Sequence, residues 1–130
     1  MNLNMTNKID LTHSVIVLRD DGIIELYAND HHVYIIEDVK ENVKAFGELT
    51  GNEKVPVLII GGSFSSLDDQ TREFMATEES LKYSKAEAFL ITSLAQKILI
   101  NFYIKFNKPL VPTRVFTDKE EAIKWLMQYK

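Results

Sequence analysis

Two short apolar runs near the start of the chain predict a β-hairpin. Ser14–Arg19 and Ile23–Ala28 are rich in Val, Ile and Leu, and only Asp20-Asp21-Gly22 separates them. Asp-Gly between two such runs is typical of a type I′ turn, which joins antiparallel strands. A third run, Val33–Ile36, predicts a further short strand before the first helix.

Apolar residues then return at helical spacing, which predicts the first helix. Asp38 and Glu41 lie three positions apart and match a capping box, with Asp38 as the N-cap. Gly51 is typical of the residue at which a helix ends. The predicted buried face of this helix comprises Val39, Val43, Phe46 and Leu49.

The unbroken apolar run Pro56–Ile60 predicts a central strand, because strands covered on both faces have no polar side. The later elements are predicted as a helix at Leu67–Glu79, a strand at Ala86–Thr92, a helix at Leu94–Phe106 capped by Ser93 or Thr92, a strand at Val111–Phe116 and a closing helix capped by Thr117 or Asp118. Pro112 lacks a backbone N–H, which favours the sheet edge for the last strand. Together these elements predict an α/β fold: a mixed sheet of about five strands with an N-terminal antiparallel hairpin and about four helices packed around it.

Composition supports a single compact domain. The chain has 130 residues, of which 45% are apolar and 26% are charged, values that are typical of globular proteins. We therefore predict one domain over residues 1–130, in which residues 1–12 form a flexible or loosely packed N-terminal segment. The absence of cysteine excludes disulfides and thiolate-bound metal.

Charge and apolar content also narrow the partners and the location. A net charge of −4 argues against a nucleic-acid binder. The polar N-terminus lacks the apolar segment of a signal peptide, and the longest apolar stretch, Leu94–Phe106, is shorter than the roughly 20 residues that span a membrane. We predict a cytoplasmic protein with no stable membrane insertion.

The histidines and the acidic residues match no catalytic or metal-binding motif. His31 and His32 are adjacent on an extended segment, so their side chains should point to opposite sides, and His13 lies at no metal-type spacing from them. Adjacent carboxylates such as Glu120 and Glu121 diverge by about 100° on a helix and do not form a catalytic pair. We therefore predict no catalytic residue, no metal site, no cofactor and no enzymatic activity.

The loop Gly61–Ser66 follows the predicted central strand, at the place where open α/β sheets bind ligands. Because backbone N–H groups there can meet an anion, Ser63, Ser65 and Ser66 are the candidate residues for an anion site. The alternative is a tight strand-to-helix turn in which the serines only cap the next helix.

The predicted helix Leu94–Phe106 is apolar around most of its circumference, whereas a helix on one face of a sheet needs only an apolar stripe. The candidates for a surface that faces a partner or an apolar ligand are Ile100, Tyr103, Ile104 and Phe106. A homodimer is the commonest way to bury such a patch, and we predict one. The alternative is that neighbouring helices of the same chain cover these residues.

Four segments of the chain carry a resemblance to a known family. They are the opening hairpin, the strand Pro56–Ile60, the strand-to-helix junction Ala86–Ser93 and the C-terminal stretch Pro112–Leu126. Their sequence and order resemble the STAS domain of the SpoIIAA type, the anti-sigma-factor antagonists, and especially the uncharacterised SpoIIAA-like bacterial proteins related to it. The resemblance implies a mixed sheet with helices packed around it and no cofactor.

In phosphorylatable STAS domains, a serine of an Asp-Ser-Ser-Gly sequence opens the helix after the central strand. Phe64-Ser65-Ser66-Leu67 resembles this motif in its place but lacks the aspartate and the glycine. The resemblance therefore implies a phosphorylation site among these loop serines. A phosphate on Ser65 or Ser66 would lie at the N-terminus of the next helix, which favours negative charge. Our leading hypothesis is a non-enzymatic regulatory or protein-interaction module with a regulatory protein partner. The alternative is a carrier or sensor of a small apolar ligand or lipid, which the related CRAL-TRIO fold implies.

Overall fold

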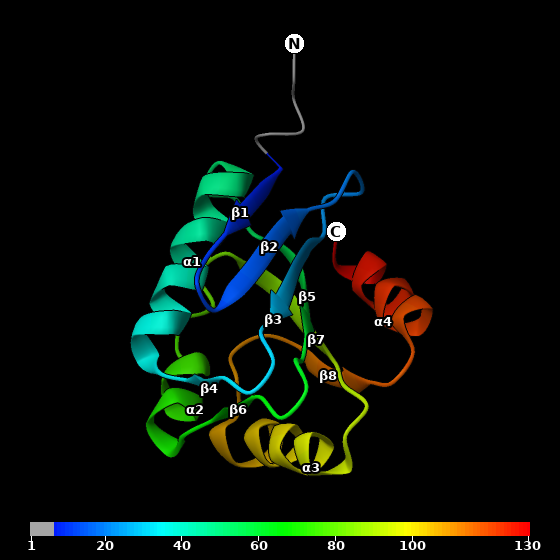
Figure 1. Ribbon diagram of the computed structural model, residues 1–130. Helices are drawn as coiled ribbons and strands as arrows, with labels where there is room; N and C mark the ends of the chain where they lie inside the picture. Colours follow the sequence, from blue (N-terminus) through cyan, green and yellow to red (C-terminus); the bar gives the residue numbers. More distant parts are fainter. Residues whose placement is uncertain (1–6) are drawn as a thin grey trace.

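Six strands form one mixed sheet in the computed structural model, which describes residues 7–130 (Figure 1). They lie side by side in the order β1 (Lys8–Asp10), β2 (Ser14–Leu18), β3 (Ile24–Ala28), β5 (Val55–Ile60), β7 (Ser84–Leu90) and β8 (Thr113–Phe116). β1 and β2 pair antiparallel, as do β2 and β3, whereas β3, β5, β7 and β8 run parallel to one another. The predicted α/β class with an N-terminal hairpin is confirmed, with six described strands in this sheet instead of about five.

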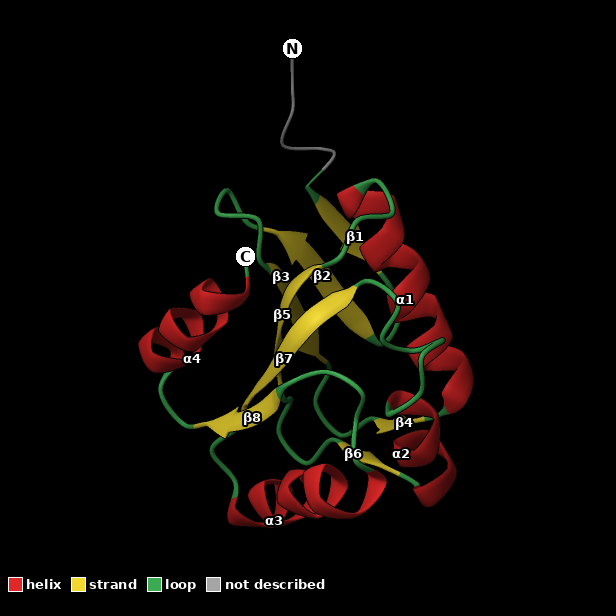
Figure 2. Ribbon diagram, turned by 180° about the vertical axis from the view of Figure 1, so that it is seen from behind, coloured by secondary structure: helices red, strands yellow, loops and turns green. Residues whose placement is uncertain are grey.

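Helices cover both faces of this sheet. Those described are α1 (Ile36–Thr50), α2 (Asp69–Met75), α3 (Leu94–Phe102) and α4 (Lys119–Leu126). α1 and α4 pack on opposite faces, and α2 and α3 close one end of the α1 side (Figures 1 and 2). α3 continues into a π turn at Tyr103–Asn107, and α4 continues into a 3-10 turn at Met127–Tyr129. β4 (Val33–Tyr34) and β6 (Ser66–Leu67) pair in parallel as a separate small sheet.

The centre of the main sheet buries different side chains on its two faces. β5, predicted as a central strand from its apolar run, lies between β3 and β7. On β7, Ala86 and Ala88 pack under α4, where their small size lets the helix lie close to the sheet. Glu87 and Phe89 point to the opposite face, toward α1, α2 and α3.

The hairpin turn differs from the type I′ turn that the sequence predicts. Gly22 has a φ of 87°, and no other residue between β2 and β3 has a positive φ. The Gly22 N–H donates to the Arg19 carbonyl oxygen at 3.0 Å, so the loop has three residues and ends in a left-handed glycine. The Asp21 carboxylate stabilises this loop by accepting from the Ile23 N–H at 3.2 Å and by pairing with the Arg19 guanidinium at 2.9 Å.

Two helices begin at residues other than the predicted ones. Ile35 is the N-cap of α1, and the carboxylate of Asp38, three residues further on, accepts from the Ile35 N–H at 3.1 Å. The prediction that Asp38 is the N-cap is therefore wrong, because β4 ends at Tyr34 and the helix begins directly after it. α2 begins after Asp68, whose carboxylate accepts from the Thr71 N–H at 2.8 Å, so the predicted helix Leu67–Glu79 is too long at both ends.

The other helix predictions agree with the structure in most respects. Gly51 ends α1 in the left-handed conformation, Ser93 is the N-cap of α3, and Asp118 is the N-cap of α4. On α1 the predicted face is buried at Val39, Val43 and Phe46 and half-buried at Leu49. The helix predicted as far as Phe106 is α-helical only to Phe102, where the π turn takes over.

The predicted loose segment at residues 1–12 contains an ordered strand. Residues 1–6 lie outside the described residues, but Lys8–Asp10 pairs with β2 and forms the edge strand β1. Ile9 packs against the core between the sheet and α1. Three residues are too few to show an alternating apolar pattern, so pairing with β2 rather than local sequence forms this strand.

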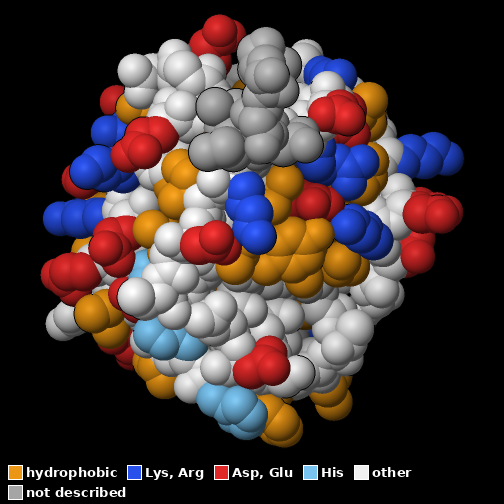
Figure 3. Space-filling view, turned by 45° about the horizontal axis from the view of Figure 1, so that its top comes forward, with side chains coloured by type: hydrophobic (Ala, Val, Ile, Leu, Met, Phe, Trp, Pro, Cys, Tyr) orange, Lys and Arg blue, Asp and Glu red, His pale blue; other side chains and the backbone are white. Residues whose placement is uncertain are grey.

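The charge distribution on the surface and the length of the helices relate to the predictions about nucleic acid and membrane. On the face that Figure 3 shows, acidic and basic side chains are interspersed. Within residues 7–130, none of the helices combines the length and the apolar character needed to cross a membrane. The cytoplasmic location and the absence of nucleic-acid binding stay predictions.

Candidate functional site

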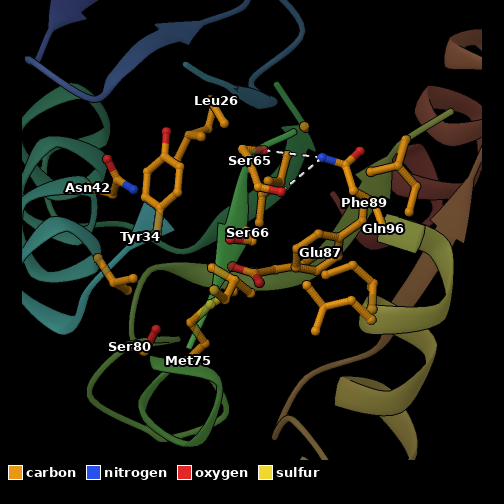
Figure 4. Close-up of a pocket in the computed structure, with 18 of the residues that line it drawn as sticks. Leu26, Tyr34, Asn42, Ser65, Ser66, Met75, Ser80, Glu87, Phe89 and Gln96 are labelled. Carbon is orange, nitrogen blue, oxygen red and sulfur yellow. Dashed lines mark hydrogen bonds between the residues drawn. The ribbon is translucent and has the colours of Figure 1, made fainter. Parts of the chain in front are cut away.

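A cavity lies between the sheet and the helices α1, α2 and α3, at the carboxyl ends of β3, β5 and β7 (Figure 4). Its volume of about 100 Å³ exceeds the roughly 10–15 Å³ that one water molecule needs. Most of its wall is apolar, with side chains that include Leu26, Val39, Phe46, Ile59, Phe89 and Ile100. Concave, mostly apolar spaces at strand ends are where α/β folds bind small molecules.

Asn42 brings a polar group into this apolar wall from α1. The side chain is buried at 5% exposure, and its Oδ1 has no hydrogen-bond partner among the described residues. A buried polar atom without a partner costs about 1–3 kcal/mol of stability. The Asn42 side-chain amide is therefore a polar group with an unmet hydrogen bond in the wall of the cavity.

Glu87 brings a carboxyl group into the same wall from β7. It is 5% exposed, and its Oε2 accepts a hydrogen bond from the Ser84 hydroxyl at 2.9 Å. Burial raises the pKa of the Glu87 carboxyl to about 7, because the charged form loses its hydration. Near neutral pH, a large fraction of Glu87 is thus protonated and able to donate a hydrogen bond.

Tyr103 adds a second unpaired group behind the wall of the cavity. The side chain is fully buried, its ring meets the Phe89 ring edge-on at 6.0 Å, and its hydroxyl has no partner among residues 7–130. Burial, together with the nearby Glu87 carboxyl, raises the pKa of the Tyr103 hydroxyl well above its usual range. Tyr103 therefore stays protonated and neutral beside Glu87.

The loop Gly61–Ser66 forms the rim of the cavity on the side of α3. The Gln96 side-chain amide donates to the Gly62 carbonyl oxygen at 2.8 Å. It also donates to the Ser65 carbonyl oxygen at 3.1 Å, as Figure 4 shows. Ser65 and Ser66 line the cavity, whereas Ser63 is exposed and its N–H donates to the Asp30 carboxylate at 2.8 Å. Two of the three candidate serines thus belong to the cavity.

The structure does not form the predicted anion site at a helix N-terminus. Ser66 belongs to β6, and the N-terminus of α2 is already occupied by the Asp68 carboxylate. The hypothesis that a phosphate on Ser65 or Ser66 would meet that N-terminus is wrong, because the helix begins later than predicted. Phosphorylation of these serines stays a prediction without this electrostatic support.

The predicted outward surface of the helix Leu94–Phe106 is only partly correct. Ile100 and Tyr103 are buried, at 5% and 0% exposure, Ile104 is half-buried, and Phe106 is exposed. Ile100 lines the cavity, so it faces inward toward the sheet. The large apolar side chains that point outward are Leu94, Ile98, Phe102 and Phe106, each 45–73% exposed, and we call them the α3 row.

A second cluster of polar side chains lies beside the start of β2. His13, which the sequence places at no metal-type spacing from other ligands, is 2% exposed, and its Nε2 lies 2.8 Å from Glu41 Oε1. His32 Nε2 lies 2.8 Å from Asp38 Oδ2, and the rings of the two histidines stack at 5.8 Å. His31 points elsewhere and stacks on Phe64, as expected for adjacent residues on an extended segment.

The pattern of apolar positions does not predict the buried polar residues Asn42 and Glu87, because that pattern identifies buried faces by their apolar side chains alone. Asn42 follows Val39 by three positions and so lies on the predicted buried face of α1. Glu87 is an acidic residue in a strand whose other side chains are mostly apolar. A polar residue at a position that the pattern buries is the sequence signal that indicates this site.

Comparison with known protein families assigns the chain to a family. Residues 16–130 match a family described as a domain of unknown function, DUF7793. The chain belongs to the DUF7793 family. None of the curated proteins matches this DUF7793 chain.

Solved structures show what the DUF7793 domain resembles in fold. An uncharacterised protein of the DUF3478 family from Shewanella loihica PV-4, with a SpoIIAA-like fold, matches with a TM-score of 0.64 and 18% identity over 91% of this chain and 97% of that chain. A protein with unknown function from Arthrobacter sp. FB24 matches with a TM-score of 0.31 and 22% identity over 87% of this chain and 92% of that chain. The DUF7793 chain has a SpoIIAA-like fold, as the resemblance in its sequence implied.

The cavity of the DUF7793 domain combines an apolar wall with a small number of hydrogen-bonding groups. Asn42 offers a side-chain amide, and protonated Glu87 offers a donor. An apolar wall contributes affinity in proportion to the area it buries, and the polar groups fix the orientation of what is bound. This arrangement can hold a small apolar molecule that carries a hydroxyl or a similar group.

Proposed function

We propose that this DUF7793 domain is a non-enzymatic carrier or sensor that binds a small, mostly apolar molecule in the cavity between the sheet and α1, α2 and α3. The observation that carries the proposal is the Asn42 side-chain amide, which lines an apolar cavity of about 100 Å³ and whose Oδ1 has no partner among the described residues. A ligand hydroxyl can both donate and accept, so it can hydrogen-bond to this amide and offset the cost of burying it. The apolar body of the ligand fills the rest of the cavity.

Glu87 adds a preference for the charge of the ligand. Its carboxyl is protonated in a large fraction of molecules near neutral pH and can donate to a ligand oxygen. An ionised group on the ligand would lose its hydration in the apolar wall, which is costly. The proposed ligand is therefore neutral, with an alcohol, carbonyl or protonated carboxyl group.

The serines on the rim support a role in binding rather than in catalysis. The Ser65 hydroxyl donates to the Gly62 carbonyl oxygen at 2.8 Å and lies 3.3 Å from the Gln96 amide. Within residues 7–130, no hydrogen bond joins a histidine ring to the hydroxyl of Ser63, Ser65 or Ser66. A serine nucleophile needs such a base to become reactive.

The variant Asn42→Leu tests the proposal, because leucine keeps the size of the side chain and removes the amide. We expect native mass spectrometry of gently purified wild-type protein to show a bound small molecule, and Asn42→Leu to lose it. We expect the wild type to bind a straight-chain alcohol more tightly than the alkane of equal length, and Asn42→Leu to bind both alike. Removing the unpaired oxygen should also raise the free energy of unfolding by about 1–2 kcal/mol.

The control is Leu110→Ser, which changes an exposed side chain that lies outside both the cavity and the α3 row. We expect this variant to keep the wild-type preference for the alcohol. If purified wild-type protein carries no small molecule and Asn42→Leu keeps the preference for the alcohol, the cavity is not a binding site.

A second candidate function is the protein-interaction role that the sequence predicts, and we propose a second copy of this chain as the partner. The α3 row favours it, because four large apolar side chains at a spacing of four residues form one continuous exposed ridge. Such ridges pack against one another when two helices cross, and monomeric proteins rarely leave them uncovered. The molar mass in solution tests this role, with variants of the row that are argued below.

A further inference from the structure

The side chains of His13, His32, Asp38 and Glu41 converge from three separate parts of the chain. His13 comes from the connection between β1 and β2, His32 from the connection between β3 and β4, and the two acidic residues from the first turns of α1. His13 Nε2 lies 2.8 Å from Glu41 Oε1 and 3.7 Å from Asp38 Oδ1. Tertiary folding, and not sequence spacing, brings these groups together.

Hydrogen bonds around Tyr34 determine which nitrogen of His13 carries a proton. The Tyr34 hydroxyl donates its hydrogen to the His13 carbonyl oxygen, which can only accept. The Ser14 hydroxyl, 3.1 Å from the Tyr34 oxygen, must therefore donate to Tyr34, because the tyrosine hydrogen is already used. Ser14 Oγ must then accept from His13 Nδ1, which lies 3.0 Å away, so the Nδ1 atom carries the proton.

This assignment leaves the lone pair of neutral His13 on Nε2, facing two carboxylates. His13 Nε2, Asp38 and Glu41 present one ligand atom each, and all three atoms lie within 4.8 Å of one another. Three acceptors that face one another repel unless a cation lies between them. The cation is either a second proton on His13 or a metal ion.

We propose that His13 Nε2, Asp38 Oδ1 and Glu41 Oε1 bind a divalent transition-metal ion of the Zn²⁺ type. An imidazole nitrogen and carboxylate oxygens are ligands that Zn²⁺ accepts, whereas Mg²⁺ and Ca²⁺ prefer oxygen ligands only. This proposal reverses our sequence-based prediction of no metal site, which treated His13 as unrelated to the other residues.

The groups around the three ligands orient them in the way that metal sites require. Ser14 holds the His13 ring by its Nδ1 atom and so directs Nε2 at the ion. His32 Nε2 holds the second oxygen of Asp38 at 2.8 Å, which leaves Oδ1 for the ion. The Glu41 side chain is 58% exposed, so the ion can enter from solvent and keep a water ligand on that side.

Titration of the full chain with Zn²⁺ alone tests the proposal by calorimetry and thermal unfolding. We expect one Zn²⁺ per chain and a higher melting temperature with Zn²⁺ but not with Mg²⁺, because only the folded protein presents the three ligands together. Glu41→Gln should weaken Zn²⁺ binding at least about tenfold. The control His31→Gln, in a neighbouring histidine that stacks on Phe64, should bind Zn²⁺ like the wild type.

Nitrogen NMR of the His13 ring separates a metal site from a protonated ion pair. On addition of Zn²⁺ we expect the Nε2 resonance to move while Nδ1 keeps its proton. The proposal is overturned if His13 stays protonated on both nitrogens in the presence of Zn²⁺, or if Glu41→Gln binds Zn²⁺ as tightly as the wild type. Because Glu41 is half exposed, this variant keeps the test valid even if replacing the buried His13 prevents folding. These outcomes do not depend on whether the cavity binds a ligand.

Discussion

Asn42 and Glu87 hold polar groups at positions where apolar side chains of similar size would stabilise the fold. Asn42 lies on the buried face of α1, and Glu87 lies between Ala86 and Ala88 on a strand with both faces covered. Buried polar groups without full hydrogen bonding reduce stability, so their presence requires a compensating role. A ligand that hydrogen-bonds to both groups provides such a role. The proposed function thus explains why the protein tolerates the loss of stability at these two residues.

Glu87 should make the stability of the folded protein depend on pH. Its pKa is raised by burial from 4.5 to about 7, so between these values the folded protein keeps a proton that the unfolded chain has lost. The free energy of unfolding therefore falls as the pH rises through this window, by at most about 3 kcal/mol at about 1.4 kcal/mol per pKa unit. Glu87→Gln should remove this fall, because the amide is neutral at every pH and can still accept from Ser84.

Urea unfolding of both proteins at about pH 5 and about pH 8 measures the effect. Other groups titrate alike in the two proteins, so the difference between them isolates Glu87. We expect Glu87→Gln to resemble the wild type at the lower pH and to be more stable at the higher pH. Equal pH dependence of the two proteins would show that Glu87 is ionised and hydrated in the folded state.

At the scale of the elements, the sequence predicted those whose pattern is local. The hairpin, the central strand β5 and the helix at Leu94 each have a repeat or a cap within their own residues, and each is confirmed. The run Val33–Ile36 likewise predicted a strand, and β4 forms there at Val33–Tyr34. The strands β1 and β6 have three and two residues, and they exist because they pair with segments elsewhere in the chain. No local pattern of apolar residues could predict them.

The same distinction explains how much of the candidate site was predictable. The loop Gly61–Ser66 was expected at the carboxyl end of the central strand, where it forms the cavity rim, because strand ends are readable from sequence. The meeting of His13 with Glu41 was not expected, since it depends on where the short β1–β2 connection lies against α1. Such contacts depend on how segments that are distant in the sequence pack together, and the spacing between residues in the sequence does not reveal this packing.

Gly62 should be the residue on which the position of the cavity rim depends. A Cβ atom there would overlap the Asn29 carbonyl oxygen, and the loop cannot move away easily because Gln96 holds the Gly62 carbonyl oxygen at 2.8 Å. We expect Gly62→Ala to lower the free energy of unfolding by about 1–3 kcal/mol, as overpacking does elsewhere. In the control Gly61→Ala, the nearest atom is a side-chain methyl of Ile91, which can shift, so the loss should be smaller. Urea unfolding compares the two, and equal losses would contradict this account.

At the scale of the whole molecule, the sheet separates two unlike halves. The side under α4 is closely packed, with Ala86 and Ala88 on the strand β7. The other side contains the cavity, and α3 forms part of its wall through Leu99 and Ile100. The outer side of α3 carries the exposed α3 row. One helix therefore lies between the proposed ligand site and the proposed contact with a second copy, so occupancy of one can affect the other.

The α3 row should hold a symmetric dimer, and charge placed on it should separate the two copies. In a two-fold contact each substitution occurs twice, so Ile98→Lys places two positive charges close together in an apolar contact. We expect sedimentation equilibrium to give a dimer for the wild type and a monomer for Ile98→Lys. The control Leu110→Lys makes the same change at a side chain that is 66% exposed but lies outside the row, and it should remain dimeric. A monomeric wild type at every concentration would contradict the proposed dimer, and loss of the dimer in both variants would show that the α3 row is not its specific contact.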